Sequence, residues 1–262
     1  MSDAEPVGST GETNRRSHLG LEVVGVLGVS FAMSGLYALL SYVRAQLTVP
    51  GGISHTSAVV VAQHRTTYPW LDLLDALADL LNGILPAVLA IALLARSPAG
   101  RGLGVGLDRL RWRREAGYGA GFFALIGLPG LGLVYLAHIW GQNASLQVVD
   151  FPDVWYRVPY LVLAAAQNGI AEEVVVVAYL LTRLRQLGWS RERAILASSV
   201  LRGSYHLYQG AGGFLGNAVM GLIFGWWFTR TRRVLPLVVA HTLLDLASFL
   251  GFLYLHPYLS WI

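Results

Sequence analysis

The stretch Gln167-Asn-Gly-Ile-Ala-Glu-Glu-Val-Val-Val-Val-Ala-Tyr-Leu-Leu181 places two adjacent carboxylates, Glu172 and Glu173, inside an apolar run from Trp155 to Thr182. That run is long enough to cross a bilayer, which needs about 20 apolar residues in a helix. Acidic side chains at membrane depth are costly, so they are rare and face a bundle interior or a water-filled cavity. We therefore expect the rest of the chain to form a membrane bundle around this pair.

The composition supports a membrane protein. Of the 262 residues, 55% are hydrophobic and only 13% are charged, whereas a soluble domain carries about 25% charged residues. The sequence therefore predicts an all-α, polytopic transmembrane helical bundle. The chain has no cysteine, which excludes a cysteine nucleophile, a thiolate metal site and a disulfide.

Seven apolar segments have about the length of a membrane span. They cover residues 19–42, 70–94, 117–140, 155–182, 194–209, 214–229 and 234–254. We predict about seven spans, or eight if the second segment breaks at Pro86. The polar residues 1–18 are expected to be a disordered cytoplasmic tail, and residues 19–262 a single transmembrane domain.

The basic residues, all of them arginine, orient this bundle. Fifteen of the 19 fall on one side of a seven-span path, Arg44, Arg65 and Arg157 fall on the other, and Arg202 lies within a span. The positive-inside rule then predicts a multi-pass plasma-membrane protein with a cytoplasmic N-terminus. Arginines in short loops between spans do not form a nucleic-acid-binding face, so we expect the lipid bilayer as a partner and no nucleic acid.

Arg15 and Arg16 before the first apolar segment weakly match a twin-arginine export signal. Ordinary flanking charge is the better interpretation, because six further spans follow and no small-residue cleavage site is present. Two glycine pairs, Gly117 with Gly121 and Gly221 with Gly225, have the small-xxx-small spacing that allows close helix packing.

Polar residues recur at membrane depth on four segments. They are Glu172 and Glu173 on the fourth, Arg202 and His206 on the fifth, Asn217 on the sixth, and His241 and Asp245 on the seventh. At a rise of about 1.5 Å per residue, the acidic and histidine groups lie about 12–20 Å from their flanking arginines. Any one of these residues could make a purely structural hydrogen bond or ion pair, but the whole set at a similar depth in the membrane predicts a functional site.

This set has the residue types of a hydrolase without a covalent nucleophile. A shielded carboxylate can act as general base on a water, and a histidine beside it can orient that water. A second histidine with a carboxylate one turn later can stabilise an oxyanion. The serine alternative is weaker because no Gly-x-Ser-x-Gly elbow is present. Zinc on Glu172, His206 and His241 stays open, although the His-Glu-x-x-His motif is absent.

The order of these motifs resembles the CPBP family, the type II CAAX prenyl endopeptidases and their bacterial Abi or bacteriocin-processing relatives. Glu-Glu followed by Tyr-Leu-Leu, a histidine at the end of the next span, and His-x-x-x-Asp on the last span carry the resemblance. It covers about 155–255. It implies that Glu172 is the general base, that Glu173 is the second glutamate and that His206 shares the water. It also implies that His241 is the oxyanion-side histidine and Asp245 its partner.

The chain departs from the family pattern at three positions. Val177 replaces the arginine of Glu-Glu-x-x-x-Arg, Ala178 replaces the glycine after it, and Arg202 stands where phenylalanine is usual. We hypothesise that Arg202 supplies the missing guanidinium and pairs with Glu173, because intramembrane charges are normally paired. Arg202 and Asn217 are then supporting residues of the site.

These observations predict an integral membrane endopeptidase that acts on a peptide or membrane-protein substrate. The family is described both as glutamate-type and as metal-dependent; we favour a mechanism that requires no cofactor, with zinc as the alternative. Two rival functions stay open. A proton-coupled transporter could use the same layer of acids and histidines, although no internal repeat is visible. An inactive membrane scaffold or immunity protein would explain Val177.

Overall fold

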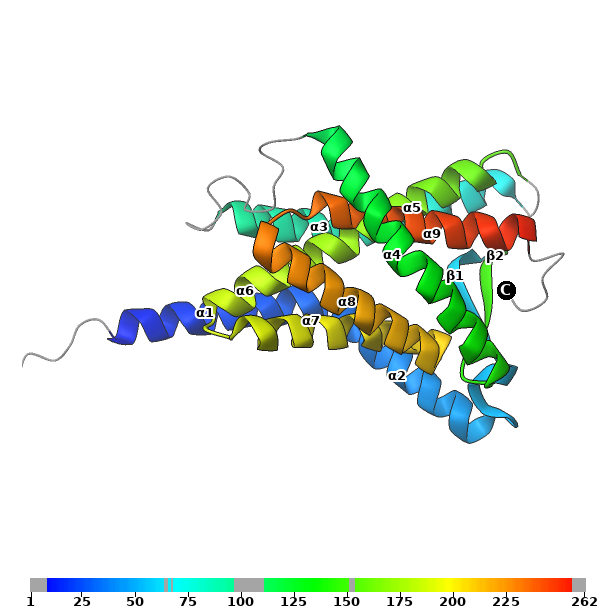
Figure 1. Cartoon of the computed structure of the whole chain (residues 1–262), viewed down its shortest axis with the longest axis horizontal. Coiled ribbons are helices and arrows are strands. Elements are labelled where there is room, and N and C mark those ends of the chain that lie inside the picture. The colour runs from blue at the N-terminus through cyan, green and yellow to red at the C-terminus, as the bar shows by residue number, and fades with distance from the viewer. Residues whose placement is uncertain (1–8, 64–65, 67, 97–110, 151–153, 256–262) are drawn as a thin grey trace, which may run out of the picture.

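The computed structural model describes residues 9–63, 66, 68–96, 111–150 and 154–255, and it is a helical bundle (Figure 1). The predicted all-α class is therefore confirmed. The helices are α1 (Ser9–Gly28), α2 (Phe31–Thr48), α3 (Pro69–Ala95), α4 (Trp112–Ile139), α5 (Arg157–Glu172), α6 (Leu180–Gln186), α7 (Arg191–Tyr205), α8 (Ala211–Thr231) and α9 (Leu235–Leu255).

Within the described residues, five helices are long and apolar enough to span a membrane, or six if the bent pair α1–α2 is one span. The prediction of seven full spans is therefore wrong, although each predicted segment is helical. The first is bent by 50° between α1 and α2. The fifth, α7, has 15 residues, which reach about 22 Å and fall short of the bilayer core of about 30 Å.

Two other expectations are corrected. The chain does not break at Pro86, which lies inside the continuous helix α3; membrane helices tolerate a proline where neighbours satisfy the freed backbone group. The predicted disordered tail is helical from Ser9 onward, while residues 1–8 lie outside the described part. Once a helix is nucleated, each added residue gains a hydrogen bond, and glutamate and arginine are good helix formers.

A small parallel sheet was not predicted. Strand β1 (Ser57–Gln63) pairs with β2 (Ser145–Asp150), and the register shifts between Val59 and Ala62. The β-branched run Val59-Val-Val61 was its sequence signal. The sheet lies beside the far end of α2, opposite the end of the bundle where α1 begins (Figure 1).

The span Arg157–Gln186 is the centre of the bundle. Its most apolar window is 67% buried, against 6% for α4 and 17% for α3. Between α5 and α6 the backbone forms a π-helical segment, η4 (Glu173–Tyr179), and all seven of its residues are buried. Large apolar side chains on α3 and α4, such as Leu81 and Leu128, are instead exposed, as expected of residues that face lipid.

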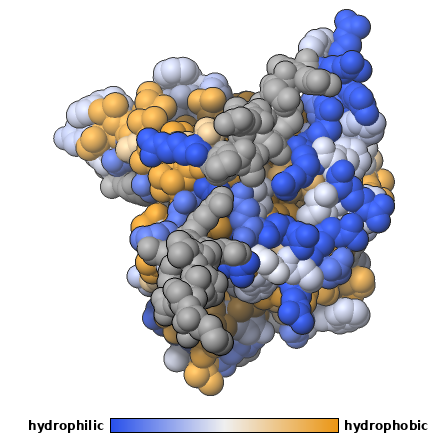
Figure 2. Space-filling view, turned by 90° about the vertical axis from the view of Figure 1, so that its left-hand side faces the viewer, coloured by the Kyte–Doolittle hydropathy of each residue, from blue (hydrophilic) through white to orange (hydrophobic). Residues whose placement is uncertain are grey.

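Charge gathers at one end of the bundle, the left-hand end of Figure 1, whose hydrophilic surface faces the viewer in Figure 2. Beneath it, the buried Arg183 donates to Glu22 at 2.8 Å and to the carbonyl of Leu93 at 2.8 Å, and so ties α6 to α1 and α3. We call this the arginine end. Its exposed arginines include Arg16, Arg185, Arg191, Arg193, Arg230 and Arg232.

The glycine prediction is confirmed for one pair and wrong for the other. A Cβ on Gly221 would lie 2.9 Å from Cα of Ser199, so α8 packs closely on α7 there. Around Gly117 and Gly121 nothing lies within 4 Å. In α4 it is Gly119, on another face of the helix, that packs against Val239 of α9.

Gly221→Leu should therefore destabilise the protein by about 1–3 kcal/mol, because the new side chain would push α7 and α8 apart. The matched control is Gly117→Leu, whose side chain enters open space and whose helix propensity improves. Thermal unfolding in detergent measures both. Equal unfolding temperatures for the two variants would contradict the packing described here.

Candidate active site

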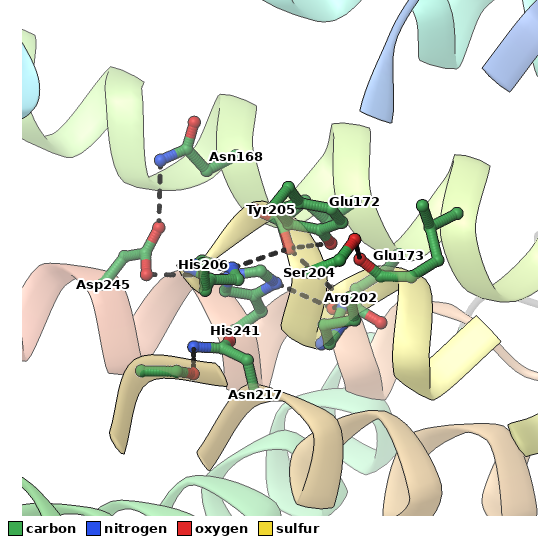
Figure 3. A network of polar contacts seen from close by, with 12 residues as sticks. Asn168, Glu172, Glu173, Arg202, Ser204, Tyr205, His206, Asn217, His241 and Asp245 are labelled. Carbon is green, nitrogen blue, oxygen red and sulfur yellow. Dashed lines mark hydrogen bonds and ion pairs between the residues drawn. The ribbon is translucent and has the colours of Figure 1, made fainter. Parts of the chain in front are cut away.

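Polar side chains from α5, η4, α7 and α9 meet inside the bundle (Figure 3). The helix changes register at this point, because Glu172 ends α5 and Glu173 begins η4. The hydroxyl of Ser198 on α7 donates to the carbonyl of Val176 at 2.6 Å, which bonds the altered backbone to α7. Such π-helical segments are frequent at functional sites.

Glu173 lies at the dry centre of this cluster and is fully buried. Its Oε1 accepts from Nη2 of Arg202 and lies 2.7 Å from Nδ1 of His241. Arg202 is also fully buried, and its guanidinium stands 5.5 Å over the ring of Phe224. The predicted pairing of Arg202 with Glu173 is therefore confirmed, and it joins α7 to η4.

Glu172 points to a different set of partners. Its Oε2 accepts from the hydroxyl of Tyr205 at 2.6 Å and lies 3.7 Å from both Nη2 of Arg202 and Nε2 of His206. Both ring nitrogens of His206 are buried without a hydrogen-bond partner among the described residues. A separation of 3.7 Å between two polar atoms is too long for a direct hydrogen bond, and a water beside the two atoms could contact both.

His241 connects Glu173 to a second acidic group. Its Nε2 lies 3.6 Å from Oδ1 of Asp245, one turn later on α9. Oδ2 of Asp245 accepts from the amide of Asn168 at 3.2 Å. A carboxylate beside each ring nitrogen orients the imidazole, as partners of functional histidines commonly do.

The structure brings together Glu172, Glu173, Arg202, His206, His241 and Asp245, all of them predicted from the sequence. Asn217 is the exception: its amide donates to the carbonyl of Gly213 in its own helix at 3.0 Å (Figure 3). Two members were missed, Asn168 and Tyr205. Asn168 lies one turn before Glu172, and Tyr205 directly precedes His206, so both positions carried a signal.

The three residues suggested for zinc do not form a ligand set as they are placed. Nδ1 of His241 lies 2.7 Å from Glu173, while Nε2 of His206 lies 3.7 Å from Glu172. Among the described residues, no three histidine, aspartate or glutamate side chains gather as metal ligands. The same acids and histidines are of the types that can activate a water by acid–base chemistry.

Comparison with known families finds a match in the part of the chain that holds the cluster. The model of the type II CAAX prenyl endopeptidase Rce1-like family matches residues 154–247. These residues form an Rce1-like domain. It contains every acid and histidine of the cluster, from Glu172 to Asp245, and confirms the resemblance predicted from the sequence. Searches of curated proteins and of solved structures found no match.

The apolar helices describe a multi-pass membrane protein, of which residues 154–247 are similar to the Rce1-like CAAX endopeptidases. This is a protease family, which implies a membrane-associated peptide or protein as substrate. The domain begins just before α5 and ends within α9, so α1 to α4 and the small sheet lie outside the match.

Proposed function

We propose that this Rce1-like protein is an intramembrane endopeptidase in which Glu172 activates a water for peptide-bond hydrolysis. The observation that carries the proposal is the pairing of Oε2 of Glu172 with Nε2 of His206 across 3.7 Å, where His206 has no other described hydrogen-bond partner. A water held between these atoms would meet a base on one side and an orienting imidazole on the other.

The reaction then needs no covalent intermediate. Glu172 takes a proton from the water, and the hydroxide adds to the carbonyl carbon of the substrate. Nε2 of His241, whose Nδ1 is engaged by Glu173, stabilises the negative oxygen that forms. Glu172 returns its proton to the nitrogen as the C–N bond breaks, so the products are one carboxylate and one amine.

The remaining residues position these groups. Arg202 and Glu173 hold His241 through its Nδ1. Asp245, which accepts from Asn168, lies 3.6 Å from Nε2, too far for a direct hydrogen bond, so that nitrogen keeps its proton for the substrate oxygen. Arg202 also balances the charge of Glu172, from which its Nη2 is 3.7 Å away. A buried carboxylate pair needs such a cation, because an unpaired buried charge is strongly unfavourable.

Tyr205→Phe is expected to lower kcat by about tenfold, because it removes one hydrogen bond that orients a charged group. The substitution keeps the ring that packs on Phe31, so the fold should be retained. Tyr118→Phe is the control, since its hydroxyl meets only Arg114 at the exposed start of α4. An unchanged kcat for Tyr205→Phe would show that this hydroxyl does not orient the base.

The function is tested by cleavage of a quenched peptide library by the purified protein in lipid. Wild type and His206→Ala are compared, each with and without a chelator. The proposal expects cleavage by wild type that the chelator leaves unchanged, and its loss in His206→Ala. Loss of wild-type cleavage with chelator and recovery with zinc would replace the glutamate mechanism with a metal-dependent one.

We further propose that the arginine end faces the cytoplasm of a plasma membrane, as the positive-inside rule requires. Because the chain has no cysteine, a maleimide labels only the cysteine that is introduced, and its labelling shows on which side of the membrane that residue lies. A membrane-impermeant maleimide should label Thr48→Cys, at the opposite end, in intact cells, and Arg230→Cys only after permeabilisation. The reverse pattern would invert the orientation.

A further inference from the structure

A cavity of about 380 Å³ lies outside the acid–histidine cluster, at the end of the bundle opposite the arginine end. It is bounded by the last turns of α2, the 3-10 turn η1 (Gly52–His55), the start of β1, and Tyr208. Tyr208 follows His206 by two residues, so one residue that lines the cavity is close in the chain to the proposed active site.

The cavity is lined by one cationic side chain, Arg44. Arg44 lines it together with the hydroxyl-bearing Ser41, Thr48 and Ser57. Among the described residues, Arg44 makes no ion pair and no side-chain hydrogen bond. An unpaired guanidinium beside hydroxyl groups suits a carboxylate, which it can bind with two parallel hydrogen bonds.

Strand β1 lines the same cavity. Ser57, Ala58 and Val59, the first three residues of β1, line it. In the described part of the chain, β1 pairs with β2 on one side and has no strand on the other. An unpaired edge offers backbone groups to an extended peptide, which is a common mode of peptide recognition.

The distance to the proposed base can be estimated along α2. A Cβ on Gly35 would lie 3.7 Å from the backbone nitrogen of Tyr205, so Gly35 marks the level of the residue that bonds Glu172. Arg44 is nine residues further on, about 13 Å at 1.5 Å per residue. An extended peptide covers that distance with about four residues at 3.3 Å each.

We propose that this cavity is a substrate subsite: it holds an extended peptide segment along β1 and binds a carboxylate of that segment on Arg44, about four residues from the bond at Glu172. The carboxylate is either the C-terminus of the peptide or an acidic side chain. The subsite rests on the proposed peptidase function, because a peptide held there has to extend to Glu172.

Binding without turnover tests the subsite separately from the chemistry. Glu172→Gln protein, in nanodiscs of zwitterionic lipid, is incubated with a degenerate octapeptide pool in C-terminal acid and amide forms. The retained peptides are identified by mass spectrometry. We expect about tenfold stronger retention of peptides that carry a carboxylate. Arg44→Gln in the same background should remove this preference, and Arg230→Gln, at the arginine end, should leave it intact.

A second variant tests the cavity itself. Ser41→Phe, which places a ring in the cavity and keeps Arg44, should weaken retention of acid and amide forms alike. Equal retention of the two forms by the starting protein, or a preference that survives Arg44→Gln, would overturn the proposal. Loss of the preference when phosphatidylglycerol is added would also overturn it, because a lipid headgroup would then be the ligand of Arg44. If these binding results hold and the wild type still cleaves nothing, the peptidase proposal alone fails.

Discussion

Glu172→Gln is expected to lower kcat/KM for peptide cleavage by about 10²- to 10⁴-fold, the usual contribution of a general base. Glutamine has the shape of glutamate and can still accept the hydrogen bond from Tyr205, but it cannot take a proton from water. The fold should therefore survive while the chemistry is lost. Initial rates on the best-cleaved library peptide, with protein in lipid, measure the effect.

The control for this variant is Glu192→Gln. Glu192 is exposed and lies in the first turn of α7, at the arginine end. It should leave both kcat and KM unchanged. Wild-type rates in Glu172→Gln would remove Glu172 from the mechanism, whatever the other acidic residues do.

Arg202→Ala is expected to abolish cleavage and to destabilise the fold by about 3–5 kcal/mol, since it leaves two buried carboxylates without their cation. Glu173 loses the partner on its Oε1, and Glu172 loses a cation 3.7 Å away. Thermal unfolding in detergent measures the first effect, and single-turnover cleavage below the unfolding temperature measures the second.

Arg183→Ala separates stability from activity. Arg183 is likewise a buried arginine paired with a glutamate, Glu22, but it lies at the arginine end. It should lose comparable stability and keep its kcat. Arg202→Lys, which keeps the charge without the planar fork, should fold and show a reduced kcat at a nearly unchanged KM. Full activity in Arg202→Ala would refute the idea that Arg202 replaces the arginine absent at position 177.

The helices of the bundle could be predicted because a segment that crosses a bilayer must be apolar and is commonly flanked by charged residues. Each predicted segment is helical, and the pairing of Arg202 with Glu173 followed from the absence of an arginine at Val177. The bend between α1 and α2 and the short α7 could not be read in this way. Hydropathy measures how apolar a segment is, whereas helix direction and depth depend on packing against neighbours.

The parts of the site that were missed depend on tertiary geometry. The π-helical segment η4 leaves no pattern in Val174-Val-Val-Val177. Its carbonyl at Val176 accepts a hydrogen bond from Ser198 on another helix, a tertiary contact that the sequence does not show. Tyr205 and Asn168 are ordinary residues for a helix until their partners are known. Asn217 was included for its polarity, yet its own helix satisfies its amide. Polar residues within the spans thus predict which helices form the site, whereas their contacts in the structure show which of these residues belong to it.

The central claim is that this protein hydrolyses a peptide bond with a water activated by Glu172. The most direct measurement is mass spectrometry of the products formed by the wild-type protein in lipid, in water labelled with ¹⁸O and in the presence of a chelator. The account predicts a new amine and a new carboxylate that carries one ¹⁸O atom, with neither formed by Glu172→Gln. Intact peptides across the whole library, or equal product from Glu172→Gln, would contradict it.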